Sequence, residues 1–249
     1  MIIATRSSPL ARWQAEAVAN RLASSAVDVE FLMVATEGAQ DRTRQIREMA
    51  GRGVFVKEVQ LAVLEGKADL AVHSAKDLMS SPTAGLNLAG FLERGDPRDA
   101  LIGMNLSQLP KGARIATGSA RRQAQLAHMR PDLKFTGLRG NMETRIAVAE
   151  RDDVDAVIVA MAALQRLGFT GSAAEVFSAE EMIPQVGQGA IALECRDDDL
   201  AINEQLLGIS DDATRRCVEA ERAFLAELGG GCELPVGAYA YLEEGIIQL

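Results

Sequence analysis

The sequence is poor in several residue types that would point to particular classes of protein. Aromatic residues make up 4% of the 249 residues, there are two histidines, and the three cysteines include no C-x-x-C pair. This composition gives no sign of a disulfide framework or a zinc site. No apolar run approaches the roughly 18 residues of a membrane-spanning helix, and no secretory signal pattern opens the chain. We therefore expect a cytoplasmic protein without a metal.

Positive charge is also scarce. The formal net charge is -9 at pH 7, whereas proteins that bind nucleic acid or anionic membranes usually present a basic face. The few aromatic side chains leave little to stack on bases. We expect neither a nucleic acid nor a membrane among the partners.

Short apolar runs alternate with helix-length segments along the chain. Candidate strands are residues 2–5, 29–35, 70–73, 100–103, 114–117, 134–137, 156–160 and 190–194. This alternation predicts an α/β protein with largely parallel sheets. Residues 9–23 are expected to form a helix, because Ser8 can cap it and Pro9 suits the first helical position.

A second clear helical pattern covers residues 211–228 and stops at Gly229. Its predicted buried stripe consists of Ala213, Cys217, Ala220, Phe224 and Leu228. Elsewhere, the segments 93–99 and 184–189 are candidate boundaries between lobes. Asp99, within the first of them, is expected to lie in a solvated turn.

Arginines follow three of the predicted strands. Arg121 and Arg122 open a predicted helix, Arg139 precedes another that contains Arg145, and Arg6 ends the first strand. Two cations at a helix start oppose its dipole by about 0.3–1 kcal/mol each, so an anion is expected there. One such arginine alone would more often be a solvated surface residue. Three loops of the same design in an acidic protein instead predict a site for a polyanion that bears carboxylates or phosphates.

The strand predicted at residues 70–73 ends near Lys76 and Asp77. Ligand crevices of α/β proteins open at the carboxyl ends of strands, and Asp77 there could act as a general acid or base beside Lys76. A Lys-Asp pair at such a place is as often a hydrated turn, and His73 could be a core histidine. From the residues alone, both interpretations stay open.

Two further segments combine glycines with a functional side chain. Residues 51–59, which include Lys57, form either a plain loop or a lid. Cys232 follows three glycines, so its thiol lies where the backbone can approach another group closely. Cys195 and Cys217 fit the usual role of a buried apolar residue better. No histidine lies near Cys232 in sequence, so a cysteine hydrolase would depend on the fold to bring one close.

Eight segments in order carry a close family resemblance: "IATRSSPLARWQA", "GVFVKEV", "DLAVHSAKD", "TGSARRQAQL", "LRGNMETR", "AALQRLG", "VGQGAIALECR" and "GGCELPVGAYA". Together they resemble the hydroxymethylbilane synthases, also called porphobilinogen deaminases, over nearly the whole chain. The resemblance implies a transferase that joins four porphobilinogen molecules, with loss of ammonia, into a linear tetrapyrrole on the route to haem. It also implies a dipyrromethane cofactor that primes the product chain and is attached covalently through Cys232.

The same resemblance assigns roles to the candidate residues. Asp77 would be the catalytic carboxylate, and Lys57 would belong to a mobile lid. The cofactor would be bound by Cys232, Lys76, Ser119, Arg121, Arg122 and Arg145. The acetate and propionate groups of the substrate would be bound by Arg6, Ser8, Arg139 and Arg166.

The resemblance further implies a three-lobed α/β fold, whose first two lobes are like the halves of a bilobal periplasmic binding protein. Lobe 1 would comprise residues 1–93 and 190–209, and lobe 2 residues 97–186. Lobe 3, residues 211–249, would be a small and shortened α+β lobe with one hairpin. A monomer is expected. Two alternatives stay open: a non-catalytic bilobal protein that binds a polycarboxylate, and a degenerate synthase limited by its short third lobe.

Overall fold

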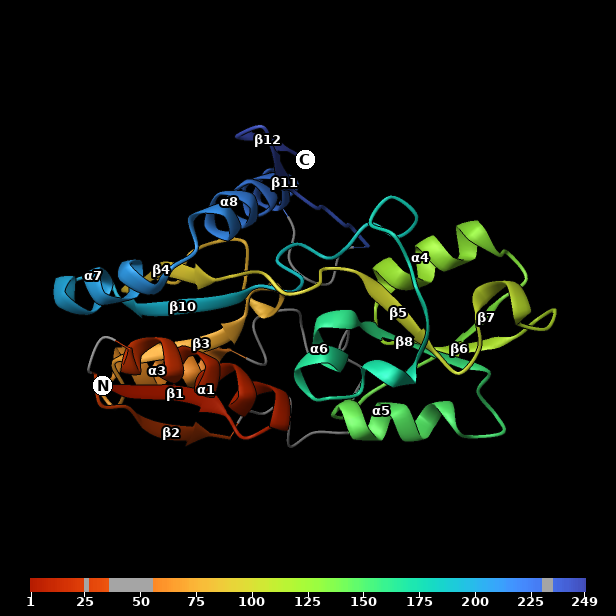
Figure 1. The fold of residues 1–249 in the computed structure, drawn as a ribbon, viewed down its shortest axis with the longest axis horizontal. Helices are drawn as coiled ribbons and strands as arrows, with labels where there is room; N and C mark the ends of the chain where they lie inside the picture. Colours follow the sequence, from red (N-terminus) through yellow and green to blue (C-terminus); the bar gives the residue numbers. More distant parts are fainter. Residues whose placement is uncertain (25–26, 36–55, 230–234) are drawn as a thin grey trace.

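The computed structural model describes residues 1–24, 27–35, 56–229 and 235–249. In this part of the chain, two five-stranded sheets lie side by side with helices on both faces, and the chain passes between them twice (Figure 1). We call the first sheet with its helices lobe 1 and the second lobe 2. The predicted α/β class is confirmed.

Lobe 1 is built on a mixed sheet. In spatial order its strands are β2 (Glu30–Val34), β1 (Ile2–Arg6), β3 (Leu70–Ser74), β10 (Ile191–Arg196) and β4 (Leu86–Leu92). β10 is antiparallel to β3 and β4, whereas β1 is parallel to β2 and β3. One face packs against helices α1 (Pro9–Ala23) and α7 (Leu200–Ile209), and the other against α3 (Lys57–Leu64). Both faces of the inner strands β1, β3 and β10 are thereby buried, whereas the edge strand β2 stays largely exposed.

Lobe 2 repeats this plan. Its strands in spatial order are β7 (Lys134–Thr136), β6 (Arg114–Ala116), β8 (Ala156–Ala160), β5 (Asp99–Ile102) and β9 (Ala173–Val176). β5 is antiparallel to both neighbours, and β6 is parallel to both. Helices α5 (Met142–Ala149) and α6 (Met161–Arg166) cover one face, and α4 (Ala120–Met129) covers the other. The short turns η2 (Leu106–Gln108) and η3 (Thr170–Ser172) lie in its connections.

The eight predicted strands are all present, with ends within two residues of the prediction. The expectation of largely parallel sheets needs one correction, because each sheet contains a strand antiparallel to its neighbours. These strands, β5 and β10, enter their sheets from the other lobe and therefore run in the reverse direction. β4 and β9 are not among the predicted strands: β4 contains Asn87 and Gly90, and β9 has only four residues.

Local capping sets the ends of the helices. Ser8 Oγ accepts a hydrogen bond from Ala11 N at 3.4 Å, and Pro9 is the first residue of α1, as predicted. Helix α8 (Asp212–Glu227) begins after Asp211, whose carboxylate accepts a hydrogen bond from Thr214 N at 2.7 Å. It ends before Gly229, whose φ of +67° lies in the left-handed region that favours glycine.

The two connections between the lobes lie against each other. We call residues 93–98 the first connection and residues 177–190 the second. Gly95 N donates a hydrogen bond to Gly189 O at 3.0 Å. Gly189 has a φ of +88°, and a Cβ atom there would lie only 2.4 Å from Gly95 O. A side chain at this position would therefore force the connections apart.

A third unit consists of α8 and a hairpin of β11 (Tyr241–Glu243) and β12 (Ile246–Gln248). α8 packs against β4, and the hairpin packs on α8 (Figure 1). The predicted stripe of α8 is only partly right. Cys217 is buried, but Phe224 and Leu228 are 38% and 50% exposed, whereas Glu221 is fully buried.

The buried carboxylate of Glu221 explains why α8 turns this face inward. Its Oε1 accepts hydrogen bonds from Arg94 Nη1 at 2.6 Å and Ala240 N at 2.8 Å, and its Oε2 accepts one from Gly187 N at 2.7 Å. Arg94 also donates from Nε to Gln188 O at 2.9 Å. A buried charge needs partners of this kind. Glu221 thus ties α8 to both connections and to the C-terminal segment.

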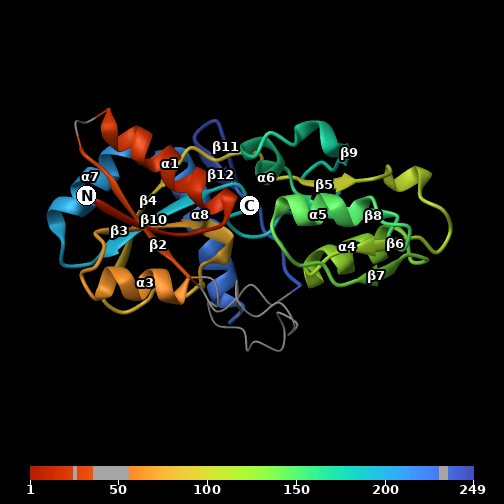
Figure 2. The same cartoon turned by 90° about the horizontal axis from the view of Figure 1, so that it is seen from below.

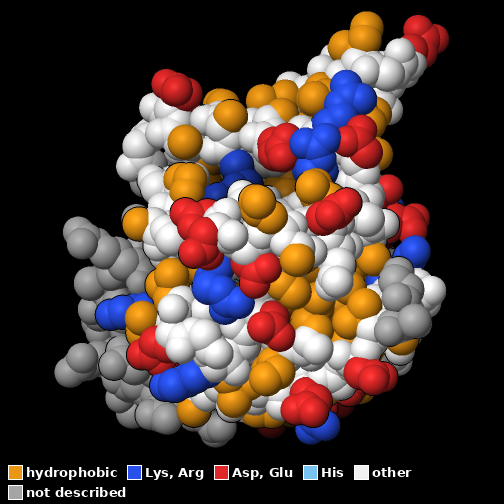
Figure 3. Space-filling model, turned by 90° about the vertical axis from the view of Figure 1, so that its left-hand side faces the viewer, with side chains coloured by type: hydrophobic (Ala, Val, Ile, Leu, Met, Phe, Trp, Pro, Cys, Tyr) orange, Lys and Arg blue, Asp and Glu red, His pale blue; other side chains and the backbone are white. Residues whose placement is uncertain are grey.

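The outer end of lobe 1 carries a mixed surface. Figure 3 shows apolar patches between acidic and basic side chains there. On α7 of this lobe, Leu200 and Leu207 are 78% and 56% exposed. No helix within the described ranges is long and apolar enough to cross a membrane.

Glu221→Ala should lower the free energy of unfolding by on the order of 3–5 kcal/mol, because it leaves Arg94 partly buried without its anion. Urea unfolding followed by circular dichroism measures this. Glu219→Ala on the same helix removes only an exposed ion pair with Arg215 and should have a much smaller effect. Equal losses for the two variants would contradict the role given to Glu221.

Candidate active site

The carboxyl ends of β1 and β3 bring three predicted site residues together. β3 continues into the short turn η1 (Ala75–Asp77), which carries Lys76 and Asp77, and Arg6 ends β1. Because β1 and β3 are parallel neighbours, these side chains share one edge of the sheet. Arg6 Nη2 lies 3.2 Å from Asp77 Oδ2, and the two side chains are 24% and 26% exposed. The structure therefore pairs the predicted catalytic carboxylate with a predicted substrate-binding arginine.

Buried polar contacts hold the end of β3 in place. Gln14 of α1 donates a hydrogen bond to Ser74 Oγ at 2.9 Å. His73 Nε2 lies 3.1 Å from Glu194 Oε2 on β10, and both residues are buried. His73 is therefore a core histidine, one of the two readings that the sequence left open.

In lobe 2, the paired arginines at the start of α4 contact an anion of the protein itself. Ser119 caps α4 by accepting a hydrogen bond from Arg122 N at 3.4 Å. Arg121 and Arg122 each place an Nη2 atom 2.7 Å from a carboxylate oxygen of Asp99, which is fully buried. The predicted solvated turn at Asp99 is wrong, because the carboxylate is turned inward toward these cations. The sequence predicts an anion at this helix start, and the carboxylate of Asp99 on β5 provides one negative charge there.

The surroundings of Asp99 favour its charged form. Burial by itself would raise the pKa of Asp99, but Arg122, Arg121 and a hydrogen bond from Gln188 outweigh it and lower the pKa from 3.8 to about 2. The arginines are less evenly satisfied. Arg121 Nη1 donates to Ile183 O at 2.6 Å, whereas Arg121 Nε is buried and has no hydrogen-bond partner among the described residues. A donor left in this state is stabilised by any acceptor that reaches it.

Lys76 lies near charged groups of both lobes: Asp77 in lobe 1, and Arg122, Asp99 and Arg145 in lobe 2. Its Nζ donates a hydrogen bond to Gln188 Oε1 at 3.2 Å. Burial and the nearby Arg122 lower the pKa of Lys76 from 10.5 to about 7, against the opposing effect of Asp77. The charge of Lys76 therefore depends on pH near neutrality.

Arg145 and Arg139 approach from the α5 side of lobe 2. Burial, together with repulsion from Arg122, lowers the pKa of Arg145 from 12.5 to about 10, so the group stays charged at neutral pH. Its Nε donates to Gly140 O at 2.9 Å. Arg139 lies half-buried in the loop between β7 and α5. Arg145 adds to the positive charge around Lys76 and Asp77.

Arg166, at the end of α6, lies where the lobes meet. Its Nη2 donates to Gly189 O at 2.6 Å, and its guanidinium group lies over the ring of Trp13 at 5.4 Å. Burial lowers the pKa of Arg166 from 12.5 to about 10. Figure 2 shows α1, which carries Trp13, close to α6 across the gap between the lobes. This predicted substrate-binding residue of lobe 2 thus contacts lobe 1 and the second connection.

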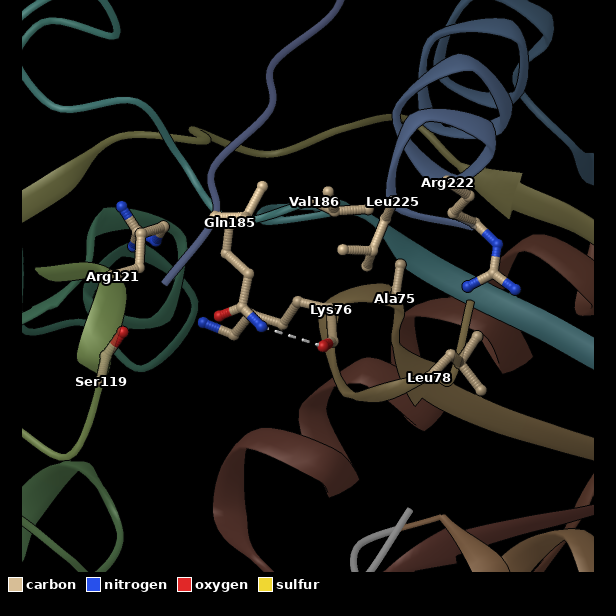
Figure 4. A pocket seen from close by; sticks show the side chains of 10 residues that line it. Ala75, Lys76, Leu78, Ser119, Arg121, Gln185, Val186, Arg222 and Leu225 are labelled. Atoms are coloured by element: carbon tan, nitrogen blue, oxygen red, sulfur yellow. Dashed lines mark hydrogen bonds between the residues drawn. The ribbon is translucent and has the colours of Figure 1, made fainter. Parts of the chain in front are cut away.

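A pocket opens between the two lobes and α8 (Figure 4). Lys76 extends into it from lobe 1, while Ser119 and Arg121 face it from lobe 2. The remaining lining residues are Ala75, Leu78, Gln185, Val186, Arg222, Leu225 and Val236. The described part of the chain contains no cluster of three His, Cys, Asp or Glu side chains that could hold a metal.

Three polar residues of this region are not among the predicted site residues. Gln185 donates from Nε2 to Lys76 O at 3.3 Å, and Gln188 contacts both Lys76 and Asp99. Arg222 lines the pocket from α8. The glutamines have no charge signal in the sequence, and Arg222 lies in a helix far along the chain from every strand end that suggested the site.

The other predicted residues lie in different settings. Ser8, two residues after Arg6, caps α1. Lys57 is exposed at the first turn of α3. Cys232 and residues 51–55 of the predicted lid lie outside the described residues, so their roles stay predictions.

Comparison with known proteins identifies the family. The sequence matches the family described as porphobilinogen deaminase, dipyromethane cofactor binding domain, over residues 1–204, and the C-terminal domain of the same family over residues 215–249. The chain belongs to the porphobilinogen deaminase family. The porphobilinogen deaminase of Xanthomonas campestris is 46% identical over 97% of this chain and 81% of its own length. That of Xylella fastidiosa is 45% identical over 99% and 83%.

Two solved binding proteins share this fold. The methionine-binding protein MetQ matches 98% of this chain and 98% of its own with a TM-score of 0.53 at 13% identity. A periplasmic substrate-binding protein of an ABC transporter from Coxiella burnetii matches 89% and 94% with a TM-score of 0.52 at 15% identity. Identities this low show the fold alone, and they confirm the bilobal arrangement expected from the sequence.

Family membership confirms the predicted activity. The chain is a transferase that joins porphobilinogen molecules, with loss of ammonia, into hydroxymethylbilane, and its cofactor is a dipyrromethane. This function is favoured over a non-catalytic polycarboxylate-binding protein, which the fold alone would also accommodate.

The residues of the pocket fit the cofactor of a porphobilinogen deaminase. Its pyrrole rings carry carboxylates. Arg122 and Arg145 lie close enough to Lys76 to lower its pKa, and Arg122 also lowers the pKa of Arg145. Arg121 adds the unsatisfied Nε donor. Mutual repulsion between cations is relieved when anions bind among them. The charges of this pocket therefore suit a ligand with several carboxylates.

Asp99→Asn should lower the free energy of unfolding at neutral pH by on the order of 3–5 kcal/mol, because two buried guanidinium groups lose their anion. The folded-state pKa of Asp99, about 2, lies below the ordinary 3.8. Its contribution to stability is therefore present above pH 3.8 and is lost as the pH falls through about 2.

The difference between wild type and Asp99→Asn should accordingly shrink between pH 4 and pH 2, as measured by urea unfolding at several pH values. Asp153→Asn, which removes an exposed ion pair with Arg151, serves as the control and should show a small difference throughout. A constant difference for Asp99→Asn across this range would speak against the assigned pKa.

Proposed function

We propose that Asp77 is the catalytic carboxylate of this porphobilinogen deaminase and that the cations around it bind the carboxylates of the pyrroles. The supporting observation is the position of Asp77 at one edge of the lobe 1 sheet, between Arg6 on its own lobe and Arg145 on lobe 2. A negative charge at this place stabilises the cationic pyrrole that forms when the substrate loses its amine. The same carboxylate can then accept the proton released after coupling.

The Arg6–Asp77 pair gives substrate binding a direct effect on the catalytic group. At 3.2 Å, Arg6 occupies one oxygen of Asp77. A carboxylate of porphobilinogen that binds Arg6 competes for this guanidinium group and leaves Asp77 able to accept hydrogen bonds from pyrrole N–H groups. Arg6 thereby exchanges its ion pair with Asp77 for an ion pair with a carboxylate of the substrate. Each pyrrole that binds in the correct place prepares the carboxylate for its own reaction.

The carboxylates of the cofactor and the growing chain are assigned to groups from both lobes. Lys76, Ser119, Arg121, Arg122 and Arg145 surround the pocket or lie beside it. Ser8, Arg139 and Arg166 are assigned to the substrate, and Lys57 to a lid. When bound, the dipyrromethane supplies the primer to which the first substrate is joined. The protein groups fix its carboxylates and leave Asp77 as the base.

The anchor is assigned to Cys232. Of the three cysteines, Cys195 and Cys217 are buried, and burial raises the pKa of the Cys195 thiol to about 11, which makes it unreactive. This leaves Cys232, in its glycine-rich segment, as the thiol suited to form a thioether. The lobe boundaries at residues 93–97, 186–190 and 209–211 belong to the same proposal. The proposal also includes a monomeric state and a cytoplasmic location. Free cysteines favour the cytoplasmic location.

Asp77→Asn should reduce the rate of porphobilinogen consumption by about 10²–10⁴-fold, because the amide can neither take up a proton nor stabilise a cation. The circular dichroism spectrum should stay unchanged. Asp153→Asn, on the far side of lobe 2, is the matched control and should retain the wild-type rate. A rate for Asp77→Asn within twofold of wild type would remove Asp77 from the mechanism.

Cys232→Ser should yield protein without the cofactor. The intact mass of wild type should exceed the sequence mass by one dipyrromethane, and this excess should map to the peptide that contains Cys232. The variant should show the sequence mass alone, while Cys217→Ala should keep the excess. A dipyrromethane retained in Cys232→Ser would place the anchor elsewhere.

A further inference from the structure

Gln188, in the second connection, has a fully buried side chain. Both the nitrogen and the oxygen of its amide make hydrogen bonds. Its Nε2 donates hydrogen bonds to Pro97 O at 2.6 Å and to Asp99 Oδ1 at 2.9 Å. Its Oε1 accepts hydrogen bonds from Lys76 Nζ at 3.2 Å and Arg122 Nη2 at 3.5 Å. Nε2 also donates to Arg98 O at 3.4 Å. The partners fix the orientation of the amide, since three oxygens face its NH₂ group and two cations face its oxygen.

We propose that Gln188 is a positioning residue for the reaction: its amide holds the Lys76 ammonium group of lobe 1 in place against the Asp99–Arg122 ion pair of lobe 2. The proposal rests on the proposed function, in which Lys76 binds a pyrrole carboxylate beside Asp77. Because Lys76 and Asp77 are adjacent on the turn η1, a displaced ammonium group changes the environment of the catalytic carboxylate.

The backbone around Gln188 is held firmly enough for this task. Gln188 O accepts a hydrogen bond from Arg94 Nε at 2.9 Å, and Arg94 is itself held by Glu221. The flanking Gly187 has a φ of +70°, and a Cβ atom there would lie 3.0–3.2 Å from atoms of Ala75 and Lys76. The second connection therefore packs directly on the turn that carries Lys76 and Asp77.

The chemistry of the position requires an amide. A carboxylate there would place an oxygen near Asp99 Oδ1, where Nε2 now donates at 2.9 Å. A cationic side chain would face Lys76 and Arg122 instead. An amide donates to the anion and accepts from the cations while carrying no charge of its own. Gln188 thus connects two oppositely charged groups without neutralising either.

This geometry also predicts how Gln188 affects the titration of Lys76. The charged groups that face Lys76 come from three elements of lobe 2 and from its own turn: Arg122 on α4, Asp99 on β5, Arg145 on α5 and Asp77 on η1. The amide oxygen of Gln188 favours the charged ammonium group by accepting its hydrogen bond. Gln188→Met removes this acceptor and should lower the pKa of Lys76, whereas Gln188→Glu adds a negative charge and should raise it.

The experiment compares wild type with Gln188→Met and Gln188→Glu. Competitive acetylation at a series of pH values, followed by peptide mass spectrometry, gives the titration midpoint of Lys76 without reference to activity. We expect it to fall in the methionine variant and to rise in the glutamate variant. For protein that carries its cofactor, kcat/KM for porphobilinogen should fall on the order of tenfold in Gln188→Met, as for one lost hydrogen bond to a charged group.

Gln125→Met is the matched control. Gln125 donates to Ile183 O at 3.0 Å and accepts from Ile183 N at 2.8 Å, so the variant loses two hydrogen bonds to the same connection without touching Lys76. It should keep the wild-type midpoint and kcat/KM. If the Gln188 variants lower only the thermal unfolding temperature and leave the Lys76 midpoint in place, Gln188 is merely structural and the proposal is overturned.

Lys76→Met and the double variant with Gln188→Met separate this proposal from the function on which it rests. Wild-type kcat/KM in Lys76→Met would refute the role assigned to Lys76 itself. A loss in Lys76→Met together with wild-type kinetics in Gln188→Met would refute only the inference. If Gln188 acts through Lys76, its substitution should change kcat/KM less than twofold in the Lys76→Met background, because coupled residues are not additive.

Discussion

The ion cluster around Asp99 is the interaction that joins β5 and α4 of lobe 2 to the second connection, on which the candidate site depends. One fully buried carboxylate holds Arg121 and Arg122 at 2.7 Å and also accepts a hydrogen bond from Gln188 at 2.9 Å. Buried ion pairs recover little more than the desolvation that they cost, so stability alone would be served as well by apolar residues. The cluster instead fixes the orientation of three groups. It holds the guanidinium groups of Arg121 and Arg122 and the amide of Gln188 toward the region where the lobes meet.

The repeated plan of the lobes explains why the site lies between them. In each sheet the parallel strands place their carboxyl ends, and the helix starts that follow, at one edge. Lobe 1 contributes Arg6 and Asp77 from its edge, and lobe 2 contributes Ser119 with the start of α4. The paired connections, held by the contact of Gly95 with Gly189, bring these edges together. An anion in the pocket therefore meets donors from both lobes at once.

The helices and strands could be predicted from the sequence more completely than the partners of the charged side chains. Ser8, Pro9 and Gly229 act locally, so the ends of α1 and α8 follow from a few neighbouring residues. Asp99 resembles any acidic residue in a polar turn, and nothing near it in sequence indicates that two arginines more than twenty residues away will bury it. Glu221 misleads in the same way, because its partners Arg94 and Gly187 come from the connections. Gln188 shows the limit most clearly, since its side chain has five hydrogen-bond partners, all more than sixty residues away in sequence.

The cations in and around the pocket repel one another, and a ligand with several carboxylates offsets this repulsion. Arg122 lowers the pKa values of both Lys76 and Arg145, and Arg145 lowers that of Lys76. Carboxylates that bind there replace repulsion with attraction, so affinity rises with the number of carboxylates on the ligand. Pyrroles that carry acetate and propionate groups meet this requirement, and a chain of them meets it repeatedly. Among the described residues, Arg6 is the one ion partner of Asp77 within 4 Å. An arginine that can change partners lets the carboxylate take part in chemistry while the other cations stay occupied.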